Sequence, residues 1–136
     1  MKRLLALAVL AITAAAAGLV LAGGGATAAT GRDNYSSCLK HAQSTFDMDQ
    51  CVGAERQRLK PLLAAAYNKL LADHSRRHLI VASQQAWLAY EKRDCSYAGS
   101  AAQGGTLRPI IQGECLVTRT RTRIRDLKKF AVPLGK

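Results

Sequence analysis

Cysteine content is the feature that most limits how this chain of 136 residues can fold. The four cysteines are widely spaced, and none belongs to a Cys-x-x-Cys pair of the kind that binds zinc. They are Cys38, Cys51, Cys95 and Cys115. An even number of cysteines in a small exported domain is typical of disulfide bonds. We therefore expect two disulfides, each adding about 2–4 kcal/mol by restricting the unfolded chain.

The N-terminal segment indicates that the chain is exported. Lys2 and Arg3 precede an uncharged apolar run over residues 4–22, and Ala26-Thr27-Ala28 then matches the small-x-small pattern of a signal-peptidase site. A membrane anchor is the alternative, because a run of this length would just span a bilayer. The many alanines in the run and the cleavage site that follows it favour a signal peptide.

This interpretation divides the chain into three parts. We predict a signal peptide at residues 1–28, a disordered N-terminal stretch at residues 29–36 and one helical domain at residues 37–132. After cleavage no transmembrane span remains, and we expect a periplasmic or secreted protein. About a hundred residues suffice for one domain and are too few for two.

Basic residues outnumber acidic ones, with 20 Lys and Arg against 9 Asp and Glu and a formal net charge of +11. Removal of the predicted signal peptide takes away only Lys2 and Arg3, so the mature chain stays strongly basic. Such a surface attracts phosphate, carboxylate or sulfate groups. The alternative is that the surplus charge only keeps an exported protein soluble.

Apolar periodicity predicts a long helix that begins near Asp47. Asp47 and Gln50 have the spacing of a capping box, in which each side chain satisfies a free backbone N–H. Apolar residues then recur on one helical face, at Val52, Leu59, Leu63, Ala66 and Leu70. Pro61 lies inside this pattern, which keeps its phase across the proline, so we expect a kink there rather than a break. A short helix is expected just before it, at residues 38–44.

Two further helices complete the predicted fold. Residues 79–97 carry a helical stripe with Trp87 close by, formed by Leu79, Ala82, Ala86, Ala89 and Tyr90. A loop follows at residues 99–105, and Pro109 suits the first turn of a final helix. The fold class is therefore all-α, a small disulfide-linked bundle of three main helices plus a short N-terminal helix. Its expected core residues are Trp87, Tyr90, Leu63 and Tyr67.

The sequence TRTRTRIR at residues 118–125 can be read in two ways. As a strand it would have arginines on one face, but no other segment alternates convincingly, and a lone strand leaves its backbone groups unpaired. As a helix it places Thr120 and Ile124 on one face and the arginines in two rows at i,i+4 spacing. We favour the helix.

That helix supplies a candidate anion-binding surface. Its members are Arg119, Arg121, Arg123, Arg125 and Lys128. Anionic envelope polymers or lipid headgroups are the expected ligands, with affinity that falls as salt rises. Few aromatic residues flank the basic run, so specific binding of nucleic acid is not expected. A solvated helix face without a ligand is the alternative.

The pairing of the cysteines is left open by the predicted topology. Consecutive helices joined by short turns run antiparallel, which brings Cys51, Cys95 and Cys115 to one end of the bundle, and Cys38 reaches that end through its short loop. This arrangement excludes none of the three possible pairings. We favour Cys38–Cys95 together with Cys51–Cys115.

Residue types that support catalysis or metal binding are present without their usual partners. His74 and His78 have a chelating spacing but lie in a predicted turn with no carboxylate or cysteine placed to complete a site. Ser37 and Lys40 match the S-x-x-K motif, but its companion motifs are missing. We therefore predict no catalytic residue, no metal site and no cofactor.

Three blocks of sequence together resemble a known family. The first contains Thr45, Asp47, Met48 and Cys51, followed by Ala54 and Glu55; the second runs from Gln84 through Ala86-Trp87-Leu88-Ala89-Tyr90 to Cys95; the third leads from Gly104-Gly105-Thr106 to Cys115, Thr120, Arg123 and Leu127. Over residues 38–130 the chain is similar to the lysozyme-inhibitor LprI-like domain of bacterial envelope proteins. It departs from the family pattern at Glu91-Lys92, where the family usually has arginine followed by an acid.

The resemblance implies a non-enzymatic, disulfide-linked helical protein whose partner is a lysozyme or another wall-cleaving enzyme. Common lysozymes are cationic, so a basic inhibitor begins with electrostatic repulsion. A local acidic patch of Asp47, Asp49 and Glu55 could offset it. The alternative function is a basic envelope module that binds anionic polymers or headgroups through its final helix.

Overall fold

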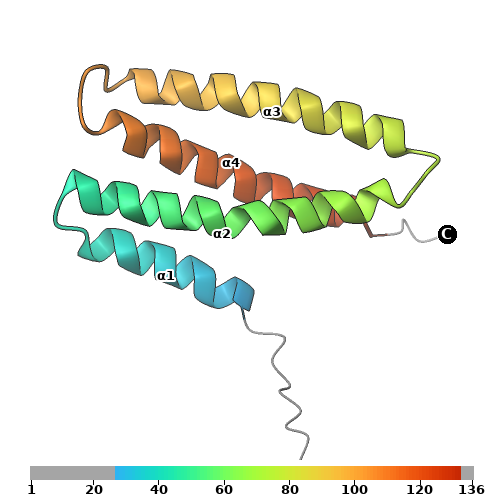
Figure 1. Ribbon diagram of the computed structural model, residues 1–136, viewed down its shortest axis with the longest axis horizontal. Coiled ribbons are helices and arrows are strands. Elements are labelled where there is room, and N and C mark those ends of the chain that lie inside the picture. The colour runs from blue at the N-terminus through green and yellow to red at the C-terminus, as the bar shows by residue number, and fades with distance from the viewer. Residues whose placement is uncertain (1–26, 133–136) are drawn as a thin grey trace, which may run out of the picture.

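A computed structural model describes residues 27–132 of the chain, and these residues form four helices (Figure 1). They are α1 (Thr27–His41), α2 (Thr45–Leu71), α3 (Arg77–Ser100) and α4 (Arg108–Phe130). The fold is an all-α bundle with two disulfides, as the sequence predicted. The predicted signal peptide lies outside the described residues, except for its last two positions, where α1 begins.

The helices run up and down beside one another, and α4 is the central element (Figure 1). It packs against α2 on one side and α3 on the other, while α1 packs on α2. The direct contact between α2 and α3 is small by comparison. Among the described residues, no helix has the length and apolar character needed to cross a membrane.

Helix α1 corrects the prediction for the N-terminal part of the domain. Residues 29–36 were expected to be disordered and residues 38–44 to form a short helix, whereas α1 is continuous from Thr27 to His41. Tyr35 and Leu39, four residues apart, pack against the hydrophobic core. A helix with so polar a sequence depends on this packing rather than on its own propensity.

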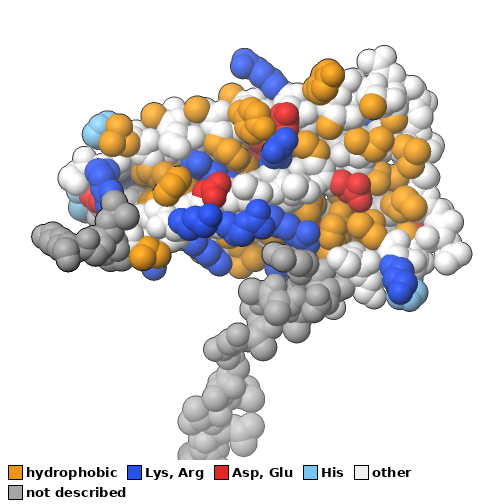
Figure 2. Space-filling view, turned by 180° about the vertical axis from the view of Figure 1, so that it is seen from behind, with side chains coloured by type: hydrophobic (Ala, Val, Ile, Leu, Met, Phe, Trp, Pro, Cys, Tyr) orange, Lys and Arg blue, Asp and Glu red, His pale blue; other side chains and the backbone are white. Residues whose placement is uncertain are grey.

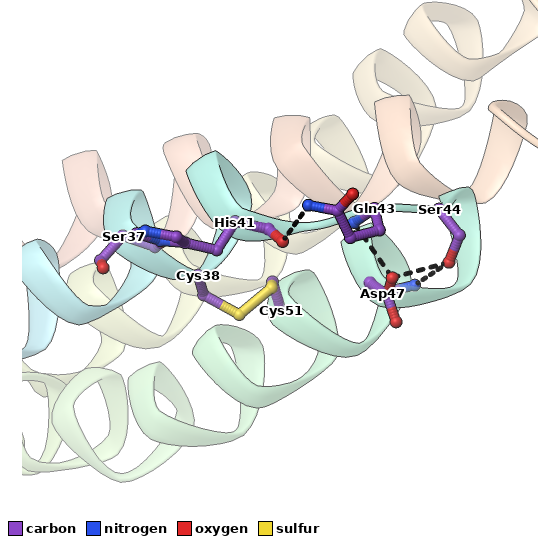
Figure 3. The surroundings of a disulfide bond; sticks show 7 residues. All are labelled: Ser37, Cys38, His41, Gln43, Ser44, Asp47 and Cys51. Atoms are coloured by element: carbon purple, nitrogen blue, oxygen red, sulfur yellow. Dashed lines mark hydrogen bonds between the residues drawn. A yellow bond between two sulfur atoms is a disulfide. The ribbon is translucent and has the colours of Figure 1, made fainter.

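The start of α2 also differs from the expectation. Ser44, not Asp47, is the N-cap residue, and its hydroxyl accepts a hydrogen bond from the Asp47 backbone N–H at 3.1 Å. The Asp47 carboxylate in turn accepts from the Ser44 hydroxyl at 2.8 Å and from the Gln43 backbone N–H at 3.1 Å (Figure 3). Capping of α2 therefore involves Ser44 and Asp47, a pair three residues before the predicted one. Downstream, α2 passes through Pro61 without a break.

Buried apolar residues from α2 and α4 form the hydrophobic core. Its central cluster consists of Val52, Leu59, Ile110, Val117 and Ile124. Leu127 of α4 is fully buried as well. Side chains of this size each contribute about 1.5–3 kcal/mol when they are removed from water. The core is thus the interface between α2 and α4.

Only part of the predicted core belongs to it. Leu63 packs against the central cluster, and Trp87 and Tyr67 are half-buried. Tyr90 is 47% exposed, so its assignment to the core was wrong. The reason is that α3 turns its polar side toward α4, which leaves its apolar stripe outside.

The disulfides join Cys38 to Cys51 and Cys95 to Cys115, with Cα–Cα distances of 5.8 and 5.4 Å. The favoured pairing, Cys38–Cys95 with Cys51–Cys115, was therefore wrong. Each bond crosslinks two consecutive helices across the turn that connects them, α1 to α2 (Figure 3) and α3 to α4. Neither bond connects the α1–α2 hairpin to the α3–α4 hairpin, so the contact between the two hairpins is non-covalent.

Candidate binding surface

The arginines of TRTRTRIR lie on a helix, and most of them are paired with side chains of α2 or α3. Arg119 donates from Nε to the Asp94 carboxylate of α3 at 2.7 Å, and its guanidinium lies 5.6 Å from the centre of the Tyr90 ring. The next residue, Thr120, donates from its hydroxyl to the Glu91 carboxylate of α3 at 3.0 Å. Burial raises the pKa of Glu91, although the Thr120 hydroxyl acts in the opposite direction. Both acids of α3 in this region therefore face α4.

Arg123 is the most deeply placed of these arginines, with 8% of its surface exposed. It donates to the Gln84 side-chain oxygen and to the Ser83 hydroxyl, both at 3.0 Å. Its guanidinium also lies 5.7 Å from the Trp87 ring centre. Burial lowers the pKa of Arg123, and the partners on α3 compensate for the water that it loses.

Arg121 points to the opposite side of α4 and meets a buried carboxylate of α2. Glu55 is 4% exposed and accepts hydrogen bonds from Arg121 at 3.1 and 2.8 Å. Arg58 adds two further bonds at 2.7 Å, and the Arg121 guanidinium lies 4.9 Å from the ring centre of Tyr35. Burial alone would raise the pKa of Glu55, but the two arginines outweigh it, and the pKa is lowered.

Glu55 was not predicted from the sequence to form ion pairs with arginines. Arg58 follows it at the i,i+3 spacing of a helical ion pair, which was the available signal. Because both arginines occupy its carboxylate, Glu55 does not contribute to a surface patch with Asp47 and Asp49. Asp47 is likewise engaged in capping α2, which leaves Asp49 as the exposed acid of the three.

The predicted anion-binding surface is consequently reduced. Arg119, Arg121 and Arg123 are engaged with α3 and α2, whereas Arg125 and Lys128 are exposed, and Arg125 donates to the Thr122 hydroxyl at 3.0 Å. Lys129 is also exposed at the end of α4. Figure 2 shows Lys and Arg side chains clustered near the middle of one face, with hydrophobic side chains spread around them. Anion binding by this helix remains a prediction that depends on its last turns.

The apolar stripe predicted for the third helix exists, but it faces solvent. We define the outer face of α3 as the exposed residues Leu79, Ala82, Ala86, Ala89, Tyr90, Arg93 and Tyr97. Leu79 is 58% exposed and Tyr97 is 82% exposed. The buried residues of α3 are instead Gln84, Cys95 and Gly99. The sequence identified the stripe correctly and its direction wrongly.

A hollow at one end of the bundle lies between the α2–α3 turn and the end of α4. Its volume is about 280 Å³, and its lining is mainly apolar: Leu70, Leu79, Ile80 and Phe130, with Asp73, Arg76 and Ser83. Hydrogen bonds from Ser75 and Arg76 lower the pKa of Asp73 to about 2. The two disulfides lie near the opposite turns of the bundle, so this end is closed by packing alone.

Potential metal ligands come together at one place in the described residues, where Asp94 lies beside Cys95 and Cys115. Both sulfurs belong to the disulfide, so neither can act as a thiolate ligand. His74 and His78 are exposed around the start of α3. Ser37 and Lys40 are exposed on α1, where the Ser37 carbonyl oxygen lies 2.7 Å from Nδ1 of His41. None of these groups forms a recognisable catalytic arrangement among residues 27–132.

Comparison with known proteins gives one family. A family model described as lysozyme inhibitor LprI matches residues 38–127. An uncharacterized protein from Rhizobium meliloti (strain 1021) is 38% identical over 48 residues, which cover 35% of this chain and 34% of that protein. The chain thus matches about a third of the length of this relative. No solved structure is significantly similar to the chain.

Proposed function

The chain belongs to the lysozyme inhibitor LprI family, and from this membership we propose that it is a non-enzymatic envelope protein that binds and inhibits a lysozyme-type enzyme. The observation that carries the proposal is the family match, which extends from the first cysteine, Cys38, into the last turn of α4 at Leu127. The two disulfides support an extracytoplasmic location, because such bonds persist in oxidising compartments.

The architecture supports a role in binding. Crosslinked hairpins around an apolar core hold exposed side chains in fixed positions, and a preorganised surface loses less conformational entropy when it binds. The described residues offer surfaces rather than a deep enclosed site. Contact with a second macromolecule is the use that such surfaces best suit.

Electrostatics limits how the target is recognised. The chain has a net charge of +11, and because Glu55 is buried, the predicted patch of Asp47, Asp49 and Glu55 does not form among the described side chains. Glycoside hydrolases nevertheless carry a pair of carboxyl groups in the catalytic cleft. A basic inhibitor can complement that cleft even when the enzyme as a whole is cationic. We therefore infer that inhibition works through the cleft rather than through net charge.

The test is the lysis of a bacterial cell-wall suspension by c-type and g-type lysozymes in the presence of excess purified protein. We expect slower lysis by at least one type, with an effect that saturates as inhibitor is added. Protein that has been reduced and alkylated is the control, because loss of both disulfides should destabilise the fold. Unchanged lysis with every enzyme would contradict the proposal.

The exposed end of α4 favours a second candidate function, the binding of anionic polymers or lipid headgroups. Arg125, Lys128 and Lys129 remain free of carboxylate partners among the described residues. Retention on vesicles with anionic headgroups should fall when salt rises and when Arg125→Glu and Lys128→Glu are combined. If retention changed neither with salt nor with the double substitution, this function would be excluded.

A further inference from the structure

The outer face of α3 is an apolar surface that no other described part of the chain covers. It runs from Leu79 through three alanines to Tyr90 and Tyr97, and these two tyrosines and the leucine are 47–82% exposed. Single exposed apolar residues are common, but a contiguous row along one helix is characteristic of an interaction surface. This row follows α3 for most of its 24 residues.

The row does not face another helix, because α3 is held from its other side. Gln84, Cys95 and Gly99 are buried on that side, and α4 supplies their partners. A Cβ placed on Gly99 would lie 3.1 Å from Cβ of Gln112, so α3 and α4 are already in close contact there. The Cys95–Cys115 bond opposes any rotation of α3 that would bury the row, and such a rotation would also separate Arg119 and Arg123 from their partners on α3.

The exposed charged residues of α3 beside this row are basic. Arg93 belongs to the outer face, and Arg77 and Lys92 are exposed on the same helix. The acids of α3, Glu91 and Asp94, are turned toward α4 and occupied by Thr120 and Arg119. A second copy of the chain that presents the same face would therefore meet like charges, which disfavours self-association. A partner surface that combines apolar groups with carboxylates fits instead.

We propose that the outer face of α3 is the surface that docks into the catalytic cleft of the target glycosidase, with Arg93 and Tyr97, at the C-terminal end of this face, as its main contacts. The inference rests on the proposed function and specifies its binding site. Arg93 and Tyr97 are four residues apart and adjacent on the helix surface. The guanidinium matches a carboxylate in bidentate geometry, and tyrosine and arginine are the residue types that most often dominate binding energy.

The α4 arginines support this surface from beneath. Arg119 lies close to the Tyr90 ring and is fixed by its ion pair with Asp94. Arg123 lies close to the ring of Trp87, one turn before Tyr90 on α3, and is fixed by its hydrogen bonds to Gln84 and Ser83. Their role is to position the outer face rather than to contact the target. This assigns a structural purpose to the basic sequence that first suggested an anion site.

The experiment compares variants of two surfaces in the lysis assay and by direct titration against the lysozyme that the wild-type chain inhibits. Tyr97→Ala should weaken binding at least about tenfold, and Arg93→Glu should weaken it further because it places like charge against the cleft. Phe46→Ala and Lys60→Glu, at exposed positions of α2, are the matched controls and should bind as the wild type does. Thermal unfolding should be the same for all four variants.

The possible outcomes distinguish failure of the proposed docking surface from failure of the proposed function. A wild-type chain that inhibits no lysozyme removes the proposed function and this inference with it. A wild-type chain that inhibits, together with α3 variants that inhibit equally well, overturns only the inference. A wild-type dimer that becomes monomeric on Tyr97→Ala assigns the outer face to a second copy and overturns it as well.

Discussion

Helix α4 has two interfaces of opposite chemistry. Toward α2 it presents Val117 and Ile124 to an apolar surface, and that interface is the core of the molecule. Toward α3 it presents Arg119, Thr120 and Arg123, which meet acids, an amide and a hydroxyl. The same helix is therefore held toward α2 mainly by burial of apolar area, beside the Arg121–Glu55 ion pair, and toward α3 by paired polar groups.

The difference shows what each interface contributes. Burial of one large apolar side chain is worth about 1.5–3 kcal/mol, whereas an intramolecular hydrogen bond contributes about 0.5–1.5 kcal/mol net. The α3–α4 interface is therefore weaker per contact but more specific, because each donor must meet its acceptor. The Cys95–Cys115 bond secures it covalently at one end. An outer helix held in this way can leave its apolar face free for another molecule.

The largest effect should come from truncating the apolar interface. Leu59→Ala removes a side chain that is 3% exposed within the central cluster, and we expect a loss of about 2–5 kcal/mol in unfolding free energy. Urea denaturation followed by circular dichroism gives the value. Leu62→Ala, on the exposed side of α2, should cost about 0.5 kcal/mol. Equal losses at both positions would mean that the α2–α4 interface is not the main source of stability.

A smaller effect is expected where α2 and α4 approach most closely. Gly113 is buried in α4, and a Cβ added there would overlap the Cγ1 atom of Val52, whose branched side chain has no room to move within the core. Gly113→Ala should therefore cost about 1–3 kcal/mol.

Gly53 in α2 is the matched control for this substitution, because a Cβ there would meet nothing within 4 Å. Gly53→Ala should stabilise the protein by about 0.5–1 kcal/mol through helix propensity alone. Thermal melts of the two variants should shift in opposite directions. A Gly113→Ala variant as stable as the wild type would show that the two helices can separate there without loss.

Sequence patterns predicted where the helices lie better than which of their faces are buried. The period of 3.6 located α2, α3 and α4, and Pro109 lies in the first turn of α4 as expected. The same period does not show whether an apolar stripe packs against another helix. Tyr90 was therefore assigned to the core, although it is exposed. Conversely, Arg123 was expected at the surface and is buried, because its partners Gln84 and Ser83 lie some forty residues away in sequence.

The disulfide pairing illustrates the same limit. Antiparallel topology brought the cysteines to one end of the bundle, but all three pairings satisfied that condition. What decided between them was which helices are direct neighbours at that end, and α1 packs on α2 rather than on α3. This arrangement depends on the Tyr35 and Leu39 contacts of α1, where only residues 38–44 were expected to be helical and residues 29–36 to be disordered.

The smallest effects are expected at two glutamates that face the two sides of α4, the buried Glu55 on α2 and the half-buried Glu91 on α3. The pKa of Glu55 is lowered by Arg58 and Arg121, so its ionised form stabilises the fold above the ordinary value of 4.5, and this contribution is lost as the pH falls through the lowered value. The pKa of Glu91 is raised by burial, with Thr120 and Arg56 acting against the rise. Its protonated form therefore stabilises the fold below 4.5, and that contribution is lost as the pH rises through the raised value.

Replacement of each glutamate by glutamine should consequently have opposite effects on the pH dependence of stability. Glu55→Gln should lose about 1–2 kcal/mol near neutral pH and less in acid, because its charged hydrogen bonds are then already weakened in the wild type. Glu91→Gln keeps an acceptor for the Thr120 hydroxyl and removes a half-buried charge, so it should be as stable as the wild type or more stable near neutral pH. Urea denaturation across the acid range measures both. If both variants lost stability at neutral pH, Glu91 would depend on its charge as much as Glu55 does, and the two carboxylates would not differ in the way their partners predict.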